Sequence, residues 1–304
     1  MPPVTSSVSR LIAVFVLQCS TMPACGGTSE TTCAKDEDCP GSFCRADGTC
    51  GPAGTDGPPL ADAPPDGTSG VCTPNNDGMI AASELPLVAG RMARFRIATG
   101  VTFDTAGQPA GGGMRRWDLT GALSGDADVP VELTSPTGAW WQPVFPTASY
   151  AVTLAAGSDL MGVFVVGAND VKLLGVVSPE AGTFRTELEY DPPAALLAVP
   201  FGAGSTWMST STVSGLAQGV ATAYTERYVS RVDQVGTMKT PYGEFPVVRI
   251  ATDLTRTQGI ATLSTSRTFA WAAECFGSVA NVSSQPFETG AEFSDAAEVR
   301  RLIP

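Results

Sequence analysis

Short runs of apolar residues, in which hydrophobic and polar positions nearly alternate, recur throughout residues 87–304. Val, Thr, Phe, Tyr and Ile fill these runs, and Gly, Pro and Asp separate them, which is typical of β-strands joined by turns. We expect strands or hairpins at residues 93–103, 115–123, 129–136, 140–145, 149–155, 159–179, 183–193, 195–200, 204–215, 221–236, 246–255, 261–273 and 277–284. Residues 159–179 should form a hairpin that turns at residues 167–170.

Helical periodicity is nearly absent from the same region. The best helix candidate is the short segment at residues 295–301. Because the connections between the expected strands are short, neighbouring strands should pair antiparallel. We therefore predict a mainly β domain at residues 87–304, an antiparallel meander that forms a curved sheet, a half-barrel or a sandwich. Residues 221–236 carry polar and apolar side chains on both faces, so the face that meets the core stays open.

Composition narrows the chemistry that this chain can perform. Its 304 residues include no histidine and carry a formal net charge of −12. Histidine is the most common general base and metal ligand, so serine–histidine triads, histidine–carboxylate iron sites and histidine-ligated zinc sites are excluded. The acidic balance, with lysine at only three positions (Lys35, Lys172 and Lys239), argues against a nucleic-acid partner.

Residues 1–24 have the features of a lipoprotein signal peptide. Arg10 precedes an apolar stretch at residues 11–18, which is too short to span a bilayer. The motif Ala-Cys-Gly-Gly at residues 24–27 resembles the lipobox of bacterial lipoproteins. That resemblance implies cleavage before Cys25, a lipid on its thiol and, because the next residue is glycine and not aspartate, an outer-membrane destination. Cys19 is a second candidate for the lipidated cysteine, and an ordinary secretory signal is the alternative to both.

The number of cysteines suits an exported protein. If Cys19 leaves with the signal peptide and Cys25 takes the lipid, an even number remains to form disulfides in an oxidising compartment. The six remaining cysteines are Cys33, Cys39, Cys44, Cys50, Cys72 and Cys275. A disulfide between Cys72 and Cys275 would join the start of the main domain to its last strands.

A Cys-rich module follows the proposed lipid at residues 25–50. This segment has too little apolar content for a core, so disulfides must hold its shape. We favour Cys33–Cys44 together with Cys39–Cys50, while the other two connectivities and a zinc site stay open. Residues 51–71 are rich in Gly, Pro, Asp and Ala and should form a disordered linker.

Residues 72–86 contain a degenerate EF-hand-like loop. Residues 73–84 align with the twelve-residue calcium loop, with Gly78 at the sharp turn. Calcium prefers hard oxygen ligands, and four residues would supply them: Asn75, Asp77, Met79 (through its backbone carbonyl) and Glu84. Thr73 and Ala81 replace the usual ligands at two positions, so calcium binding should be weak. The alternative is an Asn-Asp-Gly turn that leads into a short helical turn.

Three segments in the second half of the chain resemble a known group of proteins. They are residues 190–207 (YDPPAALLAVPFGAGSTW), 236–250 (GTMKTPYGEFPVVRI) and 269–282 (FAWAAECFGSVANV). These segments resemble exported bacterial lipoproteins and periplasmic half-barrel proteins of the LolA-like and DUF3108-like groups. The resemblance implies a curved sheet whose concave face can hold an acyl chain or another apolar ligand. It also assigns turn positions to Gly236, Pro241, Gly243 and Gly277, and core positions to Trp207, Phe245 and Trp271.

Few residues of this chain could perform chemistry. Two carboxylate pairs have the spacing that places both members on one face of a strand: Asp126 with Asp128, and Glu187 with Glu189. Such pairs can serve glycoside hydrolysis, and the alternative is a solvated strand edge. Trp140 and Trp141 could line a surface for a sugar or a lipid, or could pack in the core. The arginine doublets at residues 115–116 and 300–301 should face solvent.

Together these features predict a non-catalytic outer-membrane lipoprotein that is attached to the membrane by its N-terminal lipid. Its β-rich domain would bind an apolar ligand, a glycan or a protein partner at the cell envelope. The alternatives are a carboxylate-dependent hydrolase of envelope or extracellular polysaccharide, and a purely structural envelope component. Calcium is the one cofactor that the sequence suggests.

Overall fold

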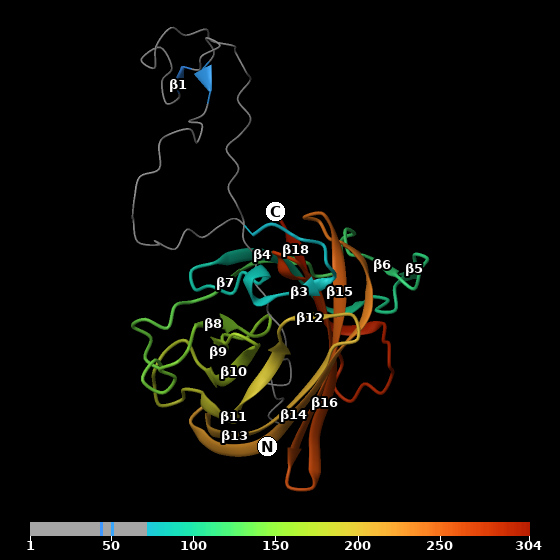
Figure 1. Cartoon of the computed structure of the whole chain (residues 1–304). Coiled ribbons are helices and arrows are strands. Elements are labelled where there is room, and N and C mark those ends of the chain that lie inside the picture. The colour runs from blue at the N-terminus through green and yellow to red at the C-terminus, as the bar shows by residue number, and fades with distance from the viewer. Residues whose placement is uncertain (1–42, 45–49, 52–71) are drawn as a thin grey trace. The chain divides into compact units, whose positions relative to one another are not determined.

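The computed structural model of this chain describes residues 43–44, 50–51 and 72–304 (Figure 1). The strands β1 (Phe43–Cys44) and β2 (Cys50–Gly51) pair antiparallel in one compact unit, and residues 72–304 belong to another. The signal peptide, the lipid on Cys25 and the linker lie outside the described residues and stay predictions. Cys33 and Cys39 also lie outside the described residues, so the disulfides expected among Cys33, Cys39, Cys44 and Cys50 stay predictions.

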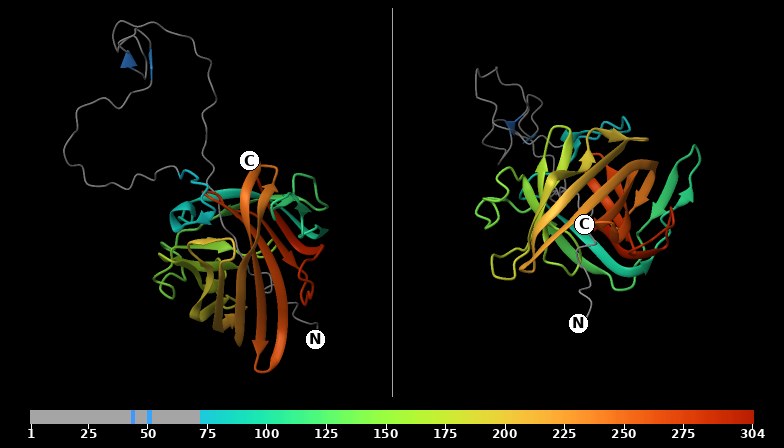
Figure 2. Two further views of the ribbon diagram at one scale, coloured as in Figure 1. Left: turned by 45° about the vertical axis from the view of Figure 1, so that its right-hand side comes forward. Right: turned by 90° about the horizontal axis from the view of Figure 1, so that it is seen from below.

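Twelve strands of residues 72–304 form one large antiparallel sheet. These strands are β4 (Met92–Thr102), β7 (Ala127–Glu132), β8 (Tyr150–Thr153), β9 (Met161–Val166), β10 (Asp170–Val177), β11 (Glu187–Ala198), β13 (Thr206–Ala217), β14 (Val220–Lys239), β15 (Glu244–Gln258), β16 (Ala261–Ala273), β17 (Gly277–Ser284) and β18 (Asp295–Ile303). Their order in space is β7-β4-β18-β17-β16-β15-β14-β13-β11-β10-β9-β8 (Figures 1 and 2). Four short strands lie outside this path: β3 (Met79–Ile80), β5 (Gln108–Pro109), β6 (Arg115–Asp118) and β12 (Phe201–Gly202). The predicted mainly β fold and antiparallel meander are confirmed, and the twelve strands form a single curved sheet.

This sheet nearly closes into a barrel at a seam between its two end strands, β7 and β8. Thr134, just after β7, and Ala151, in β8, form an isolated antiparallel bridge. Thr134 N donates to Ala151 O at 2.8 Å, and Ala151 N donates to Thr134 O at 2.9 Å. Within residues 72–304 no further ladder joins β7 to β8, so the seam is the open part of the ring.

Side chains on the inner face of the sheet form most of the core. In β14, Glu226 and Tyr228 are buried, whereas the intervening Arg227 is exposed, as expected for a strand with one face toward the core. This alternation identifies the core face that the sequence left open. The strand β18 is buried on both faces because other segments also cover its outer side. On that side, Arg301 Nη2 donates to the Gly121 carbonyl oxygen at 3.1 Å.

Two predicted elements are wrong. The helix expected at residues 295–301 is part of β18, which pairs with β17 on one side and β4 on the other. Tertiary pairing on both edges therefore outweighs the local helical preference. The strand expected at residues 140–145 forms turns, in which Val144 N donates to Trp141 O at 3.0 Å. Pro143 has no N–H to donate to a ladder, which disfavours a strand there.

The turn expected at Gly236 is also wrong, because this residue lies inside β14. The strand β6 runs parallel to β14 at this point, and a Cβ on Gly236 would lie 1.8 Å from the Arg115 carbonyl oxygen. Glycine is required here by this close approach of two backbones. Pro241 and Gly243 do lie in the turn between β14 and β15, and Gly277, with φ of 69°, directly follows the turn before β17.

Among the expected core residues, Trp271 and Phe245 are buried, and Trp207 is partly buried. Trp271 lies against Phe103 and Trp117, with ring centroids 6.0 Å and 5.5 Å away. Edge-to-face contacts at these distances stabilise a core beyond the apolar area that they bury.

A disulfide joins Cys72 to Cys275, with an S–S distance of 2.01 Å and Cα atoms 5.5 Å apart. This is the pair expected from the sequence, and it attaches the start of the domain to the turn before β17. The next residues pack on the sheet, because β3 pairs with β12 and both Ile80 and Leu85 are buried in the core. The described part of the chain has one short helix, the 3₁₀ turn Ala82–Glu84. No helix among these residues is long and apolar enough to cross a membrane.

Candidate functional site

A pocket of about 410 Å³ lies at the seam, where β7 and the connection after β8 diverge. We call it the seam pocket. Its walls come from β4, β7, β18 and the β8–β9 connection, and they include Ile97, Thr99, Ala127, Val129, Ala155 and Arg300. Sites for small molecules commonly have volumes in this range, with apolar walls and a few polar groups.

The register of three strands explains how the seam pocket is built. Ile97 of β4 lies opposite both Ala127 of β7 and Arg300 of β18. Residues paired directly across antiparallel strands project from the same face, so all three side chains share the inner side of the sheet. Thr99 lies opposite Glu298 in a neighbouring row. The apolar side chains of Ile97 and Ala127 therefore lie beside the polar row of Thr99 and Glu298, and the guanidinium of Arg300 lies at the border between them.

Arg300 and Glu298 form a buried ion pair beside the pocket, with side chains 5% and 6% exposed. Arg300 Nε donates to Glu298 Oε1, and Arg300 Nη2 donates to the Leu154 carbonyl oxygen at 2.9 Å. The second carboxylate oxygen, Glu298 Oε2, accepts a hydrogen bond from Ala156 N at 3.0 Å. The pair thus holds the connection after β8 at two points, so β18 positions this wall of the pocket.

The prediction that Arg300 and Arg301 face solvent is wrong. The doublet lies in a strand that is covered on both sides, and both residues are buried. Arg301 Nη2 donates to Asp126 Oδ2 at 2.5 Å, while Arg301 Nε and Nη1 and Asp126 Oδ1 have no hydrogen-bond partner. A guanidinium buried to this extent requires a counter-charge, so Asp126 has a structural role outside the seam pocket.

A second buried cluster lies on the inner face of β11, β14 and β15. The Glu226 carboxylate accepts hydrogen bonds from the hydroxyl groups of Tyr190, at 2.8 Å, and Tyr228. Arg256 Nε donates to Glu226 Oε1 at 2.9 Å, and the Arg256 guanidinium lies 4.6 Å from the centroid of the Tyr224 ring. The Tyr224 hydroxyl is buried without a hydrogen-bond partner.

Burial controls the protonation of this second cluster. It raises the pKa of Tyr190 and Tyr228 well above the usual value, and the neighbouring Glu226 adds to the rise. Burial also raises the pKa of Tyr224 to about 12. For Arg256, burial acts to lower the pKa, but the charge and hydrogen bonding of Glu226, together with the neighbouring tyrosines, outweigh burial and raise the pKa. These tyrosines and this arginine stay protonated at neutral pH, which favours structural hydrogen bonding over proton transfer.

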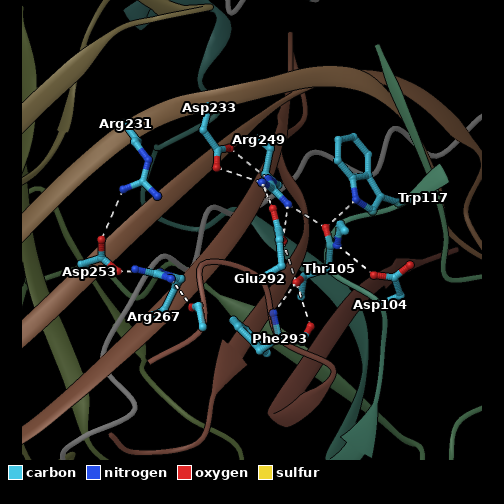
Figure 3. A network of polar contacts seen from close by, with 12 residues as sticks. Asp104, Thr105, Trp117, Arg231, Asp233, Arg249, Asp253, Arg267, Glu292 and Phe293 are labelled. Carbon is cyan, nitrogen blue, oxygen red and sulfur yellow. Dashed lines mark hydrogen bonds and ion pairs between the residues drawn. The ribbon is translucent and has the colours of Figure 1, made fainter. Parts of the chain in front are cut away.

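A third polar network fastens two loops to the outer side of β15 (Figure 3). Arg249 Nη2 contacts Asp233 Oδ2 at 2.8 Å and Glu292 Oε1 at 2.6 Å. The Thr105 carbonyl oxygen accepts hydrogen bonds from Arg249 Nη1 at 2.6 Å and from Trp117 Nε1 at 2.8 Å. All five N–H groups of the buried Arg249 guanidinium have acceptors in this network, which supports a structural role.

The four carboxylates considered for hydrolysis do not form a site. Asp128 pairs with Arg96 at 2.6 Å, whereas Asp126 pairs with Arg301. Glu187 pairs with Arg185 at 2.7 Å. Glu189, which is two residues after Glu187 in β11, is exposed. No member of the two pairs lines the seam pocket or a second, more open pocket that is formed by Asp159 and residues 178–185.

The adjacent tryptophans lie in turns and mainly serve packing. Trp141 is buried in a small apolar cluster with Phe145. Trp140 is partly buried, and its Nε1 donates to the Ser178 carbonyl oxygen at 3.0 Å. The Arg185 guanidinium lies 5.8 Å from the centroid of the Trp140 ring. The Trp140 indole therefore has a hydrogen-bond acceptor within the protein, and Trp141 contributes apolar packing.

The structure brings together only part of the predicted calcium loop. Asn75 and Asp77 are exposed and bonded to each other, with Asn75 Nδ2 3.1 Å from Asp77 Oδ2. Glu84 is buried, and its carboxylate accepts a hydrogen bond from Ala81 N at 2.8 Å. Met79 forms β3. Among the described residues, no three His, Cys, Asp or Glu side chains are grouped to hold a metal ion. Calcium binding stays a prediction.

Sequence reasoning missed the seam pocket, because its walls come from strands that are far apart in the chain. An available signal was that Arg300 and Arg301 are adjacent, because a strand at residues 295–303 would place their side chains on opposite faces. No protein-family model matches the chain, and searches of curated proteins and of solved structures found no match either. The geometry of the seam pocket is therefore the basis for assigning a function.

Proposed function

We propose that residues 72–304 form a non-catalytic binding domain whose seam pocket takes an apolar or amphipathic small molecule. The seam pocket is the observation that carries this proposal. Its walls combine the apolar side chains of Ile97, Ala127 and Val129 with the guanidinium of Arg300. Apolar walls favour burial of hydrocarbon. Within residues 72–304, Arg300 is the one charged residue of these walls, and because Glu298 already compensates its charge, its guanidinium suits an uncharged polar end of the same ligand, such as a hydroxyl group.

Binding is a better match to this site than hydrolysis. A glycoside hydrolase needs two carboxyl groups on either side of the bond that it cleaves, about 5–10 Å apart. Among the described residues that line the seam pocket, none is Asp or Glu. The carboxylate of Glu298, beside the pocket, is engaged by Arg300 and by Ala156 N.

We also propose that the protein is an outer-membrane lipoprotein anchored through Cys25. The lipobox-like motif at residues 24–27 supports the anchor. The disulfide between Cys72 and Cys275 supports an oxidising compartment outside the cytoplasm, where such bonds persist.

Native mass spectrometry of the protein purified from its own envelope tests the binding function. We expect the wild type to carry a small amphipathic molecule and to bind the apolar dye N-phenyl-1-naphthylamine. Ala127→Trp should lose both, because Ala127 is an exposed wall residue and the indole would fill the pocket. Thr210→Trp, on the exposed outer face of β13, is the matched control and should keep both. A wild type without bound ligand or dye, or an Ala127→Trp variant that retains them, would contradict the proposal.

A further inference from the structure

Large apolar side chains are exposed at several hairpin tips. They lie in, or in the strand ends directly after, the connections β10–β11, β13–β14, β15–β16 and β17–β18. The five residues, which we call the apolar rim, are Phe184, Val220, Ile260, Leu263 and Phe287. Successive turns of an antiparallel meander alternate between its two ends, so these four connections share one end of the sheet. Ile260 is fully exposed and Phe184 is 82% exposed, so neither contributes to the core.

The segments that carry the apolar rim come from adjacent parts of the sheet, and Phe287 lies further from the β15–β16 tip than Leu263, beside Thr265. Gly219 N, in the β13–β14 turn, donates to the Arg185 carbonyl oxygen at 2.9 Å and thereby contacts the loop that carries Phe184. The strands β14 and β15 are paired along most of their length, and Phe287 N donates to Thr265 O of β16 at 2.8 Å. Figures 1 and 2 show the β15–β16 hairpin projecting at this end of the sheet.

The central part of the apolar rim carries no charge. Residues 214–225 and 257–266, which include the tips of two adjacent hairpins, contain no Asp, Glu, Lys or Arg, although the whole chain has a net charge of −12. Ile260 also occupies a two-residue turn between Gln258 and Ala261, a position where small or polar residues are usual. The turn does not require an isoleucine at this position, because Gly259 alone supplies its positive φ.

We propose that the apolar rim inserts into the surface of a lipid bilayer. Its side chains come from separate segments of the chain, and a fluid bilayer can bury each of them without a matching surface. The paired backbone of each hairpin satisfies its own hydrogen bonds, so insertion leaves few polar groups unpaired. The flanking loops carry Glu180, Glu288 and Glu292 against one cation, Arg185, whose charge is paired with Glu187. A neutral bilayer therefore suits the apolar rim better than an anionic one.

The chain before residue 72 is long enough for this contact. It meets the sheet at the opposite end, where Cys72 is bonded to Cys275. Residues 51–71 alone could span up to about 70 Å when extended, whereas the fifteen residues of β15 span about 50 Å. The proposed lipid on Cys25 and the apolar rim can therefore meet the same bilayer. Insertion of the rim does not depend on the seam pocket.

Fluorescence quenching tests the proposal. The full chain carrying Ile260→Trp is mixed with phosphatidylcholine vesicles whose acyl chains are brominated. Thr210→Trp is the matched control, because Thr210 is exposed on the outer face of β13, away from the apolar rim. With the fluorescence of the native tryptophans subtracted, we expect bromine to quench the indole at position 260 strongly and the indole at position 210 little. Ile260→Asp should lower vesicle partitioning of the non-lipidated chain about tenfold or more.

Equal quenching at the two positions would overturn the proposal, because a lipid anchor alone would hold both indoles near the vesicle. Self-association in lipid-free solution that Ile260→Asp abolishes, together with an unquenched indole at position 260, would also overturn it and would identify an interface between copies of the chain. Dye binding by the seam pocket is measured on the same variants. A result that contradicts membrane insertion by the apolar rim can therefore be distinguished from a result that contradicts ligand binding by the seam pocket.

Discussion

Glu298 and Arg300 lie two residues apart on the inner face of β18, and their buried ion pair holds the backbone of the β8–β9 connection at Leu154 and Ala156. The two groups therefore link the wall of the seam pocket to a strand that is paired on both edges. Because the pair is buried, each charge depends on the other for compensation.

We predict that Glu298→Gln lowers the free energy of unfolding by about 3 kcal/mol, because it leaves the Arg300 guanidinium buried without its counter-charge. Dye binding in the seam pocket should weaken as well, since the wall at residues 154–156 loses one of its two attachments. Urea denaturation and dye titration measure these effects. Glu132→Gln, at an exposed position of β7, is the control and should change neither. Equal stability of the two variants would contradict the assigned role of the pair.

Asp126 makes the stability of the domain depend on pH. Burial acts to raise its pKa, but the hydrogen bonds from Arg301 and from Leu123 N, together with the charges of Arg301 and Arg96, outweigh burial and leave the pKa below its usual value of 3.8. A lowered pKa means that this stabilisation is present above pH 3.8 and is lost as pH falls through the lowered value. Asp126→Asn should therefore destabilise the protein at pH 7 by about 2 kcal/mol. The difference from the wild type should shrink at acidic pH.

The matched control for this prediction is Asp128→Asn. Asp128 pairs with Arg96 on the surface, where both side chains are more than a third exposed, so its removal should have little effect at pH 7. Thermal unfolding of the three proteins between pH 2 and pH 7 tests the prediction. If Asp128→Asn were the more damaging variant, the buried contact between Asp126 and Arg301 would not have the role that we assign to it.

The tyrosines around Glu226 offer a second matched pair. Tyr190→Phe removes a hydrogen bond to the buried Glu226 carboxylate and should destabilise the domain by about 2 kcal/mol. Tyr224→Phe removes a buried hydroxyl that has no partner, so it should be neutral or slightly stabilising. Denaturant unfolding compares the two variants. A larger loss for Tyr224→Phe would contradict the described hydrogen bonding.

The disulfide also has a measurable effect. Replacing Cys72 and Cys275 together by Ser should destabilise the domain by about 4 kcal/mol, because the bond closes a very long loop. The far-ultraviolet circular dichroism of the folded variant should not change, since the sheet pairs independently of this bond. Unfolding with and without reductant provides the measurement. A wild type that reductant leaves unaffected would argue against a structural disulfide.

The class and topology of the fold could be predicted from the sequence, because alternating apolar runs and short connections specify local strands and antiparallel neighbours. The hairpin at residues 159–179 is an example, and it forms β9 and β10. The segment at 295–301 was harder to assign, because its strand state depends on pairing with β17 and β4, which a local pattern does not contain.

The seam pocket could not be predicted for a related reason. Ile97 and Arg300 are about two hundred positions apart, and only the pairing of β4 with β18 brings them together. The place where β7 and β8 diverge depends on how far the sheet closes, which no residue pattern specifies. By contrast, Cys72 and Cys275 could be paired in advance, because they remained after the cysteines of the Cys-rich module were assigned to each other.

A crystal structure of the protein with its co-purified ligand tests the proposed binding function most directly. We expect ligand density between β7 and the β8–β9 connection, with hydrocarbon against Ile97 and Ala127 and a polar end near Arg300. Ala127→Trp crystals grown in parallel should show the indole in that place and no ligand. Density for the ligand elsewhere on the molecule, with only water in the seam pocket, would contradict the function that we propose.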